Sequence, residues 1–170
     1  MPAPPQRRPQ IAVCGDGDPD SGHRDVARRA GRMIAEAQAV LLTGGLAGVM
    51  AAAAEGARQA GGVAVSVLPG SSADDSVASA DVTVATGAGE ARNVILVRSA
   101  DAVVAIGGGF GTLSEIALAR KLGLPVFGYR TWSATTPDGG EPLLRNCESI
   151  DDAVSQAIAA AREAASAGRD

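Results

Sequence analysis

The chain has 170 residues, of which 46% are hydrophobic and 20% are charged, a composition typical of one globular domain. Its formal net charge of −4 gives the backbone of a nucleic acid little long-range attraction, and an aromatic content of 2% leaves few side chains to stack on bases. We therefore expect no nucleic-acid partner and, because no apolar run approaches the roughly 18 residues that span a bilayer, no membrane partner and a cytoplasmic location.

Apolar runs alternate with helix-favouring stretches along the chain. Most of the apolar runs are hydrophobic throughout, which is typical of parallel strands covered by helices on both faces. The sequence predicts strands at residues 11–14, 40–42, 63–68, 82–85, 102–106 and 125–129. It predicts helices at residues 23–37, 49–60, 90–99, 112–122 and 149–165.

This alternation predicts a doubly wound parallel α/β sheet, Rossmann-like, with six or seven strands and helices on both faces. We expect a single domain over residues 10–165, between a flexible N-terminal tail at residues 1–9 and a C-terminal tail at residues 166–170. The long stretch 131–148 is interpreted as a lid, as an edge strand with turns, or as part of a subunit contact.

Ligands of such sheets bind outside the carboxyl ends of the strands, so the loops after residues 14, 43, 68, 85 and 106 are the candidate site. A dinucleotide fingerprint would place its third glycine at position 20, which is Asp20. A phosphate-binding Walker loop needs a lysine in the loop, but the single lysine, Lys121, falls at the far end of a helix. With Cys14 and Cys147 isolated and His23 as the only histidine, we expect neither a disulfide nor a metal site.

The sequence GGGFGTLSE at residues 107–115 joins the strand at 102–106 to the helix that follows. Glycines at such a junction let backbone N–H groups approach an anion, and the helix N-terminus adds positive potential. We interpret this loop as a phosphate cradle. Thr112 and Glu115 also fit a capping box, in which Thr112 caps the helix and Glu115 reaches back to the backbone of residue 112.

The same stretch resembles the signature PGGxGTxxE of the LONELY GUY family, formerly labelled lysine decarboxylases, which includes cytokinin-activating phosphoribohydrolases. The sequence GGLAGVM at residues 44–50 resembles that family's second glycine-rich loop, and Arg92 lies where the family has an Arg-Lys pair. The resemblance covers residues 10–130. The chain has Asn93 in place of the lysine and Gly107 in place of the proline, and it looks closest to a short branch that resembles molybdenum cofactor carrier proteins.

The resemblance implies a site for a small phosphorylated ligand, and no required cofactor. The ligand would be a nucleotide or the molybdenum cofactor, and the protein a homodimer or homotetramer, which alanine-rich helices such as residues 49–60 would also favour. The residues expected to contact the ligand are Gly15, Gly44, Gly45, Arg92, Asn93, Gly108, Gly109, Phe110, Gly111 and Thr112.

Two functions fit these residues. In the first, which the Arg92-Asn93 pair favours, the protein binds or carries the phosphorylated ligand. Arg92 would then make paired hydrogen bonds to phosphate, and Asn93 would recognise the edge of a base or pterin without carrying charge. In the second, the protein hydrolyses the N-glycosidic bond of a nucleoside 5′-monophosphate. Arg92 would then fix the ligand, and Glu115 would stabilise the cationic sugar in the transition state.

Overall fold

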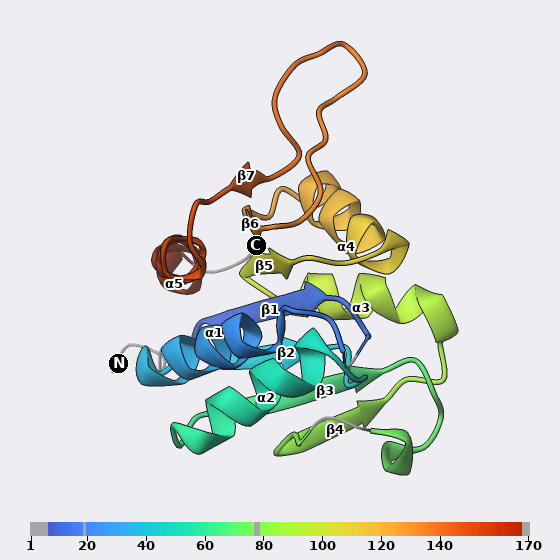
Figure 1. The fold of residues 1–170 in the computed structure, drawn as a ribbon. Coiled ribbons are helices and arrows are strands. Elements are labelled where there is room, and N and C mark those ends of the chain that lie inside the picture. Colours follow the sequence, from blue (N-terminus) through green and yellow to red (C-terminus); the bar gives the residue numbers. More distant parts are fainter. Residues whose placement is uncertain (1–6, 19, 77–78, 168–170) are drawn as a thin grey trace, which may run out of the picture.

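The computed structural model describes residues 7–18, 20–76 and 79–167. Within them, seven strands form one sheet in the order β4-β3-β2-β1-β5-β6-β7, and every neighbouring pair is parallel (Figure 1). The strands are β1 (Gln10–Gly15), β2 (Val40–Thr43), β3 (Val63–Leu68), β4 (Val82–Ala85), β5 (Ala102–Ile106), β6 (Val126–Tyr129) and β7 (Arg145–Asn146).

Helices connect the strands and cover the sheet on both faces, so the predicted doubly wound fold is confirmed. The helices are α1 (Arg24–Glu36), α2 (Val49–Gln59), α3 (Arg92–Ser99), α4 (Phe110–Lys121) and α5 (Ile150–Ala167), with short 3-10 turns η1 (Ala73–Asp75) and η2 (Gly89–Ala91). Among the described segments, no helix is both long and apolar enough to cross a membrane.

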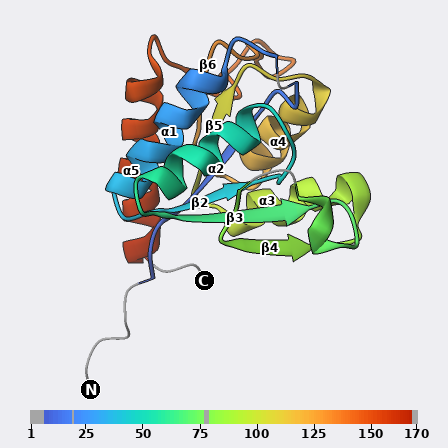
Figure 2. The ribbon, with the colours of Figure 1, turned by 60° about the horizontal axis from the view of Figure 1, so that its bottom comes forward.

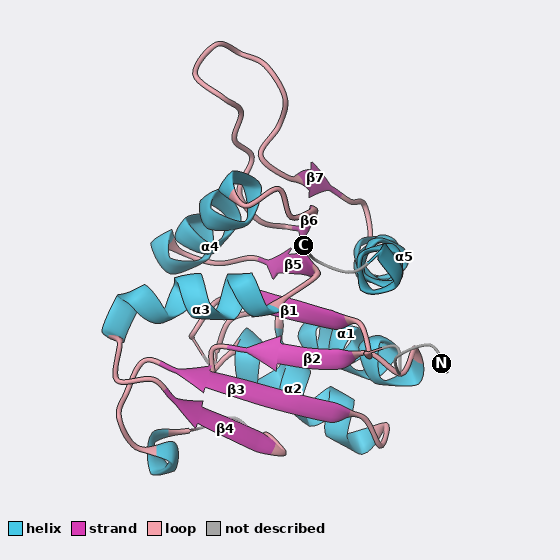
Figure 3. Cartoon of the chain, turned by 180° about the vertical axis from the view of Figure 1, so that it is seen from behind, coloured by secondary structure: helices cyan, strands magenta, loops and turns pink. Residues whose placement is uncertain are grey.

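The two faces of the sheet carry separate hydrophobic cores. On one face, Ile11 and Val13 of β1 pack with α1, α2 and α5, which lie together in Figure 2. On the other face, Ala12 and Cys14 pack with α3 and α4, which cover the sheet in Figure 3. Alternate residues of a strand point to opposite faces, so a strand that is apolar throughout supplies both cores.

Helices α1 and α2 approach each other closely because small residues meet between them. A Cβ atom on Gly31 would lie 1.9 Å from the carbonyl oxygen of Ala53, and one on Gly56 equally close to the carbonyl oxygen of Arg28. The alanine-rich surface of α2 is therefore used inside the chain. It no longer supports the expectation of a homo-oligomer, because the packing that it favours is intramolecular.

The long stretch 131–148 contains β7 at the edge of the sheet, which agrees with its interpretation as an edge strand with turns, and its first part forms a loop that projects beyond β6 (Figure 1). Of the tail expected at 1–9, only residues 7–9 are described, and Arg7 donates two hydrogen bonds to Asp101. Helix α5 continues to Ala167, so it includes the first two residues of the expected C-terminal tail.

Candidate functional site

A cavity of about 480 Å³ lies at the carboxyl edge of the sheet. Its wall includes residues that follow four strands: Gly15 ends β1, Leu46 follows β2, Pro69 follows β3 and Gly109 follows β5. Strands β1 and β5 are neighbours, and the chain builds the sheet outward from them in opposite directions. Open α/β sheets bind ligands outside such a reversal point, so the cavity lies where the fold itself predicts a ligand.

Arg92 is the most unusual polar residue of this cavity. It begins α3, is 6% exposed, and among the described residues its Nε and Nη1 atoms have no hydrogen-bond partner. Gly44 makes room for it, because a Cβ atom there would lie 2.3 Å from Nη1. Burial lowers the pKa of Arg92, although the neighbouring Glu115 raises it. Leaving buried donors unpaired costs free energy, so such donors in a cavity are suited to an incoming acceptor.

Glu115 faces Arg92 from helix α4. Its Oε1 atom lies 3.8 Å from Arg92 Nη1, too far for a hydrogen bond, and Glu115 is 7% exposed. The predicted capping box is wrong, because α4 begins two residues earlier than expected, at Phe110, with Gly109 as its N-cap and no side-chain cap. Thr112 and Glu115 therefore lie inside the helix and line the cavity.

Burial raises the pKa of Glu115 to about 7, although the charge of Arg92 and a hydrogen bond from Cys14 both lower it. Cys14 lies beneath Glu115 on β1, where burial and then the charge of Glu115 raise the pKa of its thiol well above the usual value. Near neutral pH, the cavity wall therefore carries a charged guanidinium and a carboxyl group that is close to its titration point, and the buried thiol of Cys14 is neutral.

The glycine-rich loop between β5 and α4 supplies backbone donors. The N–H of Gly108 donates to Asp16 Oδ1 at 2.7 Å, so the expectation that Gly108 offers this group to a ligand is corrected. The N–H groups at the start of a helix have no acceptor within the helix, so those of residues 109–112 have no helical partner. Gly109, Gly111 and Thr112 line the cavity.

Asp16 and His23 hold the glycine loop from behind. The second carboxylate oxygen of Asp16 lies 2.7 Å from His23 Nδ1, and the backbone oxygen of Asp16 accepts a hydrogen bond from Val49 at the start of α2. A Cβ atom on Gly107 would collide with both side chains. From the sequence, Asp16 fits the lining of the first loop and turn formation equally well, and the packing of the chain places it beside Gly108, 92 positions away.

The loop that follows β6 fastens the outer side of the same glycine loop. Thr131 donates a hydrogen bond to the backbone oxygen of Gly107, and the indole of Trp132 donates to that of Gly109 at 3.1 Å. The ring of Trp132 also lies against Phe110, with the ring centroids 5.7 Å apart. The start of the 131–148 stretch therefore positions the loop that carries the backbone donors.

The predicted contact residues divide into three groups. Gly15, Arg92, Asn93, Gly109, Gly111 and Thr112 line the cavity. Gly44, Gly45 and Gly108 support it from behind: Gly44 accommodates Arg92, and Gly45 fits against Leu68. Phe110 is 80% exposed and lies outside the lining. Whether any of them contacts a ligand is still a prediction.

Further lining residues were missed by the sequence analysis. They are Gly17, Leu46, Met50, Pro69, Gly89 and Glu90. All follow the carboxyl end of a strand, where ligands of open α/β sheets bind, so this rule could have found them. They belong to no chemical motif that would single out one residue. Leu46, Met50 and Pro69 add an apolar part to the cavity wall, which also contains the polar side chains of Arg92 and Glu115.

Asn93 is held in place within the cavity wall. Its side-chain nitrogen donates to Ser114 Oγ at 2.9 Å, and Ser114 in turn donates to the backbone oxygen of Gly111. These bonds tie the start of α3 to the start of α4. They leave the carbonyl oxygen of Asn93 as a neutral acceptor for a ligand N–H group.

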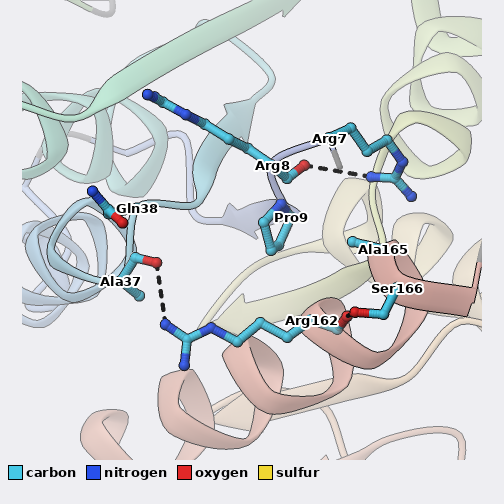
Figure 4. Close-up of a pocket in the computed structure, with 8 residues that line it drawn as sticks. All are labelled: Arg7, Arg8, Pro9, Ala37, Gln38, Arg162, Ala165 and Ser166. Atoms are coloured by element: carbon cyan, nitrogen blue, oxygen red, sulfur yellow. Dashed lines mark hydrogen bonds between the residues drawn. The ribbon is translucent and has the colours of Figure 1, made fainter. Parts of the chain in front are cut away.

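A second cavity, of about 450 Å³, lies where residues 7–9, the end of α1 and the end of α5 meet (Figure 4). Arg7, Arg8 and Arg162 line it, but two of these arginines already have partners. Arg7 is bonded to Asp101, and Arg162 donates to the backbone oxygen of Ala37 at 3.2 Å, at the C-terminus of α1. A cation is favourable at a helix C-terminus, so these arginines have structural roles that need no ligand.

The first cavity thus combines an unpaired buried guanidinium, free backbone amides and an apolar wall. This combination suits a ligand with an oxyanion at one end and an apolar or heterocyclic body at the other. Within the described segments, no group of three or more His, Cys, Asp or Glu side chains is arranged to hold a metal ion.

Comparisons with known proteins show what this chain is similar to. The model of the SLOG cluster4 family (LDcluster4) matches residues 8–161. An uncharacterized protein of Archaeoglobus fulgidus is 49% identical over 114 residues, which are 67% of this chain and 75% of that protein.

Two solved structures are similar over almost their whole length. The molybdenum cofactor binding protein of Rippkaea orientalis has a TM-score of 0.79 and 34% identity, covering 88% of this chain and 95% of that one. The Moco carrier protein of Chlamydomonas reinhardtii has a TM-score of 0.75 and 36% identity, covering 90% of this chain and 99% of that one.

Proposed function

The chain belongs to the SLOG cluster4 family, and from this premise we propose that it binds and carries a small phosphorylated ligand in the cavity at the carboxyl edge of the sheet. The ligand is nucleotide-like or similar to the molybdenum cofactor. Two structures similar to this chain are proteins named for binding or carrying the molybdenum cofactor, which supports a carrier role here.

One observation carries this proposal: Arg92 is buried in the cavity wall with Nε and Nη1 unpaired. Buried guanidinium nitrogens without hydrogen-bond acceptors are unfavourable in the free protein, and a phosphate would supply the missing acceptors through charge-assisted hydrogen bonds. Gly109, Gly111 and Thr112 line the same cavity, and their backbone N–H groups would add further donors. The apolar wall of Leu46, Met50 and Pro69 would cover the rest of the ligand.

The proposal is tested by titrating the protein with AMP and following backbone amide chemical shifts. We expect the largest shifts at residues 109–112 and at Arg92, and adenosine, which lacks the phosphate, should bind more weakly and leave these amides nearly unchanged. Arg162→Ala serves as the matched control, because Arg162 lines only the second cavity. Shifts confined to residues around Arg8 and Arg162 would contradict the proposal. Mass spectrometry of ligands that copurify with the protein would identify the natural one.

The alternative activity is hydrolysis of a nucleoside 5′-monophosphate. The position of Glu115 in the cavity wall is the observation that favours it. Glu115 lines the cavity instead of capping its helix, so its carboxylate is available to stabilise a cationic sugar. Release of free base from nucleoside monophosphates by the wild type, abolished in Glu115→Gln with binding intact, would establish the hydrolase. A carrier should release no base and should keep its affinity in that variant.

We also propose that the protein self-associates, as the resemblance to the LONELY GUY family implies. Exposed apolar side chains on the α3 and β4 side of the molecule, Ile95 at 42% and Val82 at 51%, offer surface for a second copy. Light scattering should show a dimer or tetramer, and Ile95→Glu should shift it toward the monomer. A monomer at every concentration would contradict this expectation.

A further inference from the structure

The proposed anion site contains a carboxyl group, which calls for an explanation. Glu115 lines the same cavity as Arg92, at 3.8 Å from it, and is nearly as buried. An ionised Glu115 would repel a phosphate bound to Arg92 and residues 109–112, and burial would strengthen this repulsion. A protonated Glu115 would instead offer an O–H donor to the same phosphate.

We propose that Glu115 contacts the ligand in its protonated form, as a hydrogen-bond donor to the anionic group, so that anion binding takes up one proton from solvent. This inference rests on the proposed function. It assigns Glu115 the role of a ligand-binding donor whose proton makes the site selective for oxyanions with several acceptor oxygens. A tetrahedral phosphate monoester has enough oxygens for Arg92, the amides and Glu115 together.

The surroundings of Glu115 support protonation. The ionisable groups that face it are Arg92 from α3 and Cys14 from β1, and Glu90 lines the same cavity. Burial already raises the pKa of Glu115 to about 7 with Arg92 nearby. A bound anion would neutralise Arg92 and add negative charge, and both effects raise this pKa further. Cys14 stays a neutral thiol, because burial and Glu115 raise its own pKa.

The test uses sulfate as the probe, because sulfate stays a dianion across the neutral range while phosphate itself changes charge. Calorimetry of the wild type in two buffers with different ionisation enthalpies should show uptake of close to one proton per sulfate near pH 8. The association constant should fall by up to about tenfold per pH unit above pH 7. Glu115→Gln, which keeps a neutral donor, should bind sulfate with no proton uptake and a flat pH profile.

A matched control changes a residue away from this cavity. Arg162 lines the second cavity and not this one, so Arg162→Ala should keep the proton uptake and the slope of the pH profile. A second measurement, NMR of the wild-type chain, does not depend on the folding of any variant. The side-chain carboxyl carbon of Glu115, followed by NMR, should titrate near pH 7 in the free protein and at higher pH with sulfate.

Two different failures can be told apart. Sulfate binding with no proton uptake, or a Glu115 carboxyl that titrates lower when sulfate is added, would overturn the role of Glu115 and leave the anion site intact. Persistence of the same pH slope in Glu115→Gln would overturn the role of Glu115. Absence of sulfate binding at every pH would overturn that role and would also contradict the proposed function.

Discussion

Two arginine–carboxylate pairs lie at different edges of the sheet, and they differ in how fully they are bonded. Near the amino ends of the strands, Asp101 is 1% exposed and accepts hydrogen bonds from Arg7 at 2.6 and 2.7 Å and from the backbone of Gln10 at 2.9 Å. At the carboxyl edge, Arg92 and Glu115 are both buried but 3.8 Å apart, without a hydrogen bond between them.

The difference shows what each pair is for. A buried carboxylate with all its acceptors in use fixes the chain locally, and Asp101 joins the start of β1 to the segment between α3 and β5. A buried pair whose atoms stay apart contributes little to stability, because its desolvation is not compensated. We expect the first pair to matter for folding and the second for ligand binding, and four measurements test this difference.

The largest expected effect is on the pH dependence of stability through Glu115. Its pKa is about 7 in the folded chain and near 4.5 in a solvated one, so the folded state holds the proton more tightly. The free energy of unfolding should therefore fall as pH rises from about 4.5 to about 7, by roughly 3 kcal/mol in total.

Urea denaturation of the wild type and Glu115→Gln across this pH range checks that prediction. The variant has no such group, so its stability relative to the wild type should rise with pH by the same amount. If the difference in the free energy of unfolding between wild type and variant is constant with pH, then burial does not penalise the ionised form of Glu115. The contrast between Glu115 and Asp101 would then be wrong.

Next in size is the effect of Arg92→Ala on ligand affinity. Removing charge-assisted hydrogen bonds worth roughly 1.5–3 kcal/mol should weaken AMP binding by about 10- to 150-fold. Stability should change little, because no hydrogen bond within the described chain is lost from Nε or Nη1. Calorimetry with AMP and thermal unfolding measure both, and Arg98→Ala, on the same helix but outside the cavity lining, should leave affinity unchanged.

Asp101→Asn should produce the opposite pattern. The variant keeps the volume but loses charge and one carboxylate acceptor, which should lower the free energy of unfolding by about 1–2 kcal/mol. Half-exposed Arg7 can turn to solvent, and this limits the loss. AMP affinity should stay within about twofold of wild type; a larger loss would mean that the two ends of the sheet are coupled.

The smallest expected effect is that of Gly44→Ala. The new methyl group would lie 2.3 Å from Arg92 Nη1 and 2.8 Å from Met50 Sδ, both on side chains that can shift. Displacing the guanidinium should weaken AMP binding by a few-fold, less than about 1 kcal/mol, with little change in stability. Unchanged affinity would show that the place of Arg92 against Gly44 is not needed for binding.

The sheet, its two helical layers and the edge at which the cavity lies could all be predicted from the amino-acid sequence. These features follow from local patterns: apolar runs of strand length, glycines at strand ends, and the rule that ligands bind beyond the carboxyl ends of parallel strands. Arg92, Asn93 and the glycine loop could be singled out in the same way, because each directly follows a predicted strand or lies at the start of a helix.

Which polar groups already have hydrogen-bond partners could not be predicted from the sequence and became visible in the folded chain. Asp16 and Gly108 are hydrogen-bonded across 92 positions of sequence, and Arg7 and Asp101 across 94. The start of α4 at Phe110 turned Glu115 from a predicted cap into a lining residue beside Arg92. A hydrogen bond needs atoms within about 3 Å of each other. Residue types and spacing fix the position of a side chain along an element, but its partner depends on how distant elements pack.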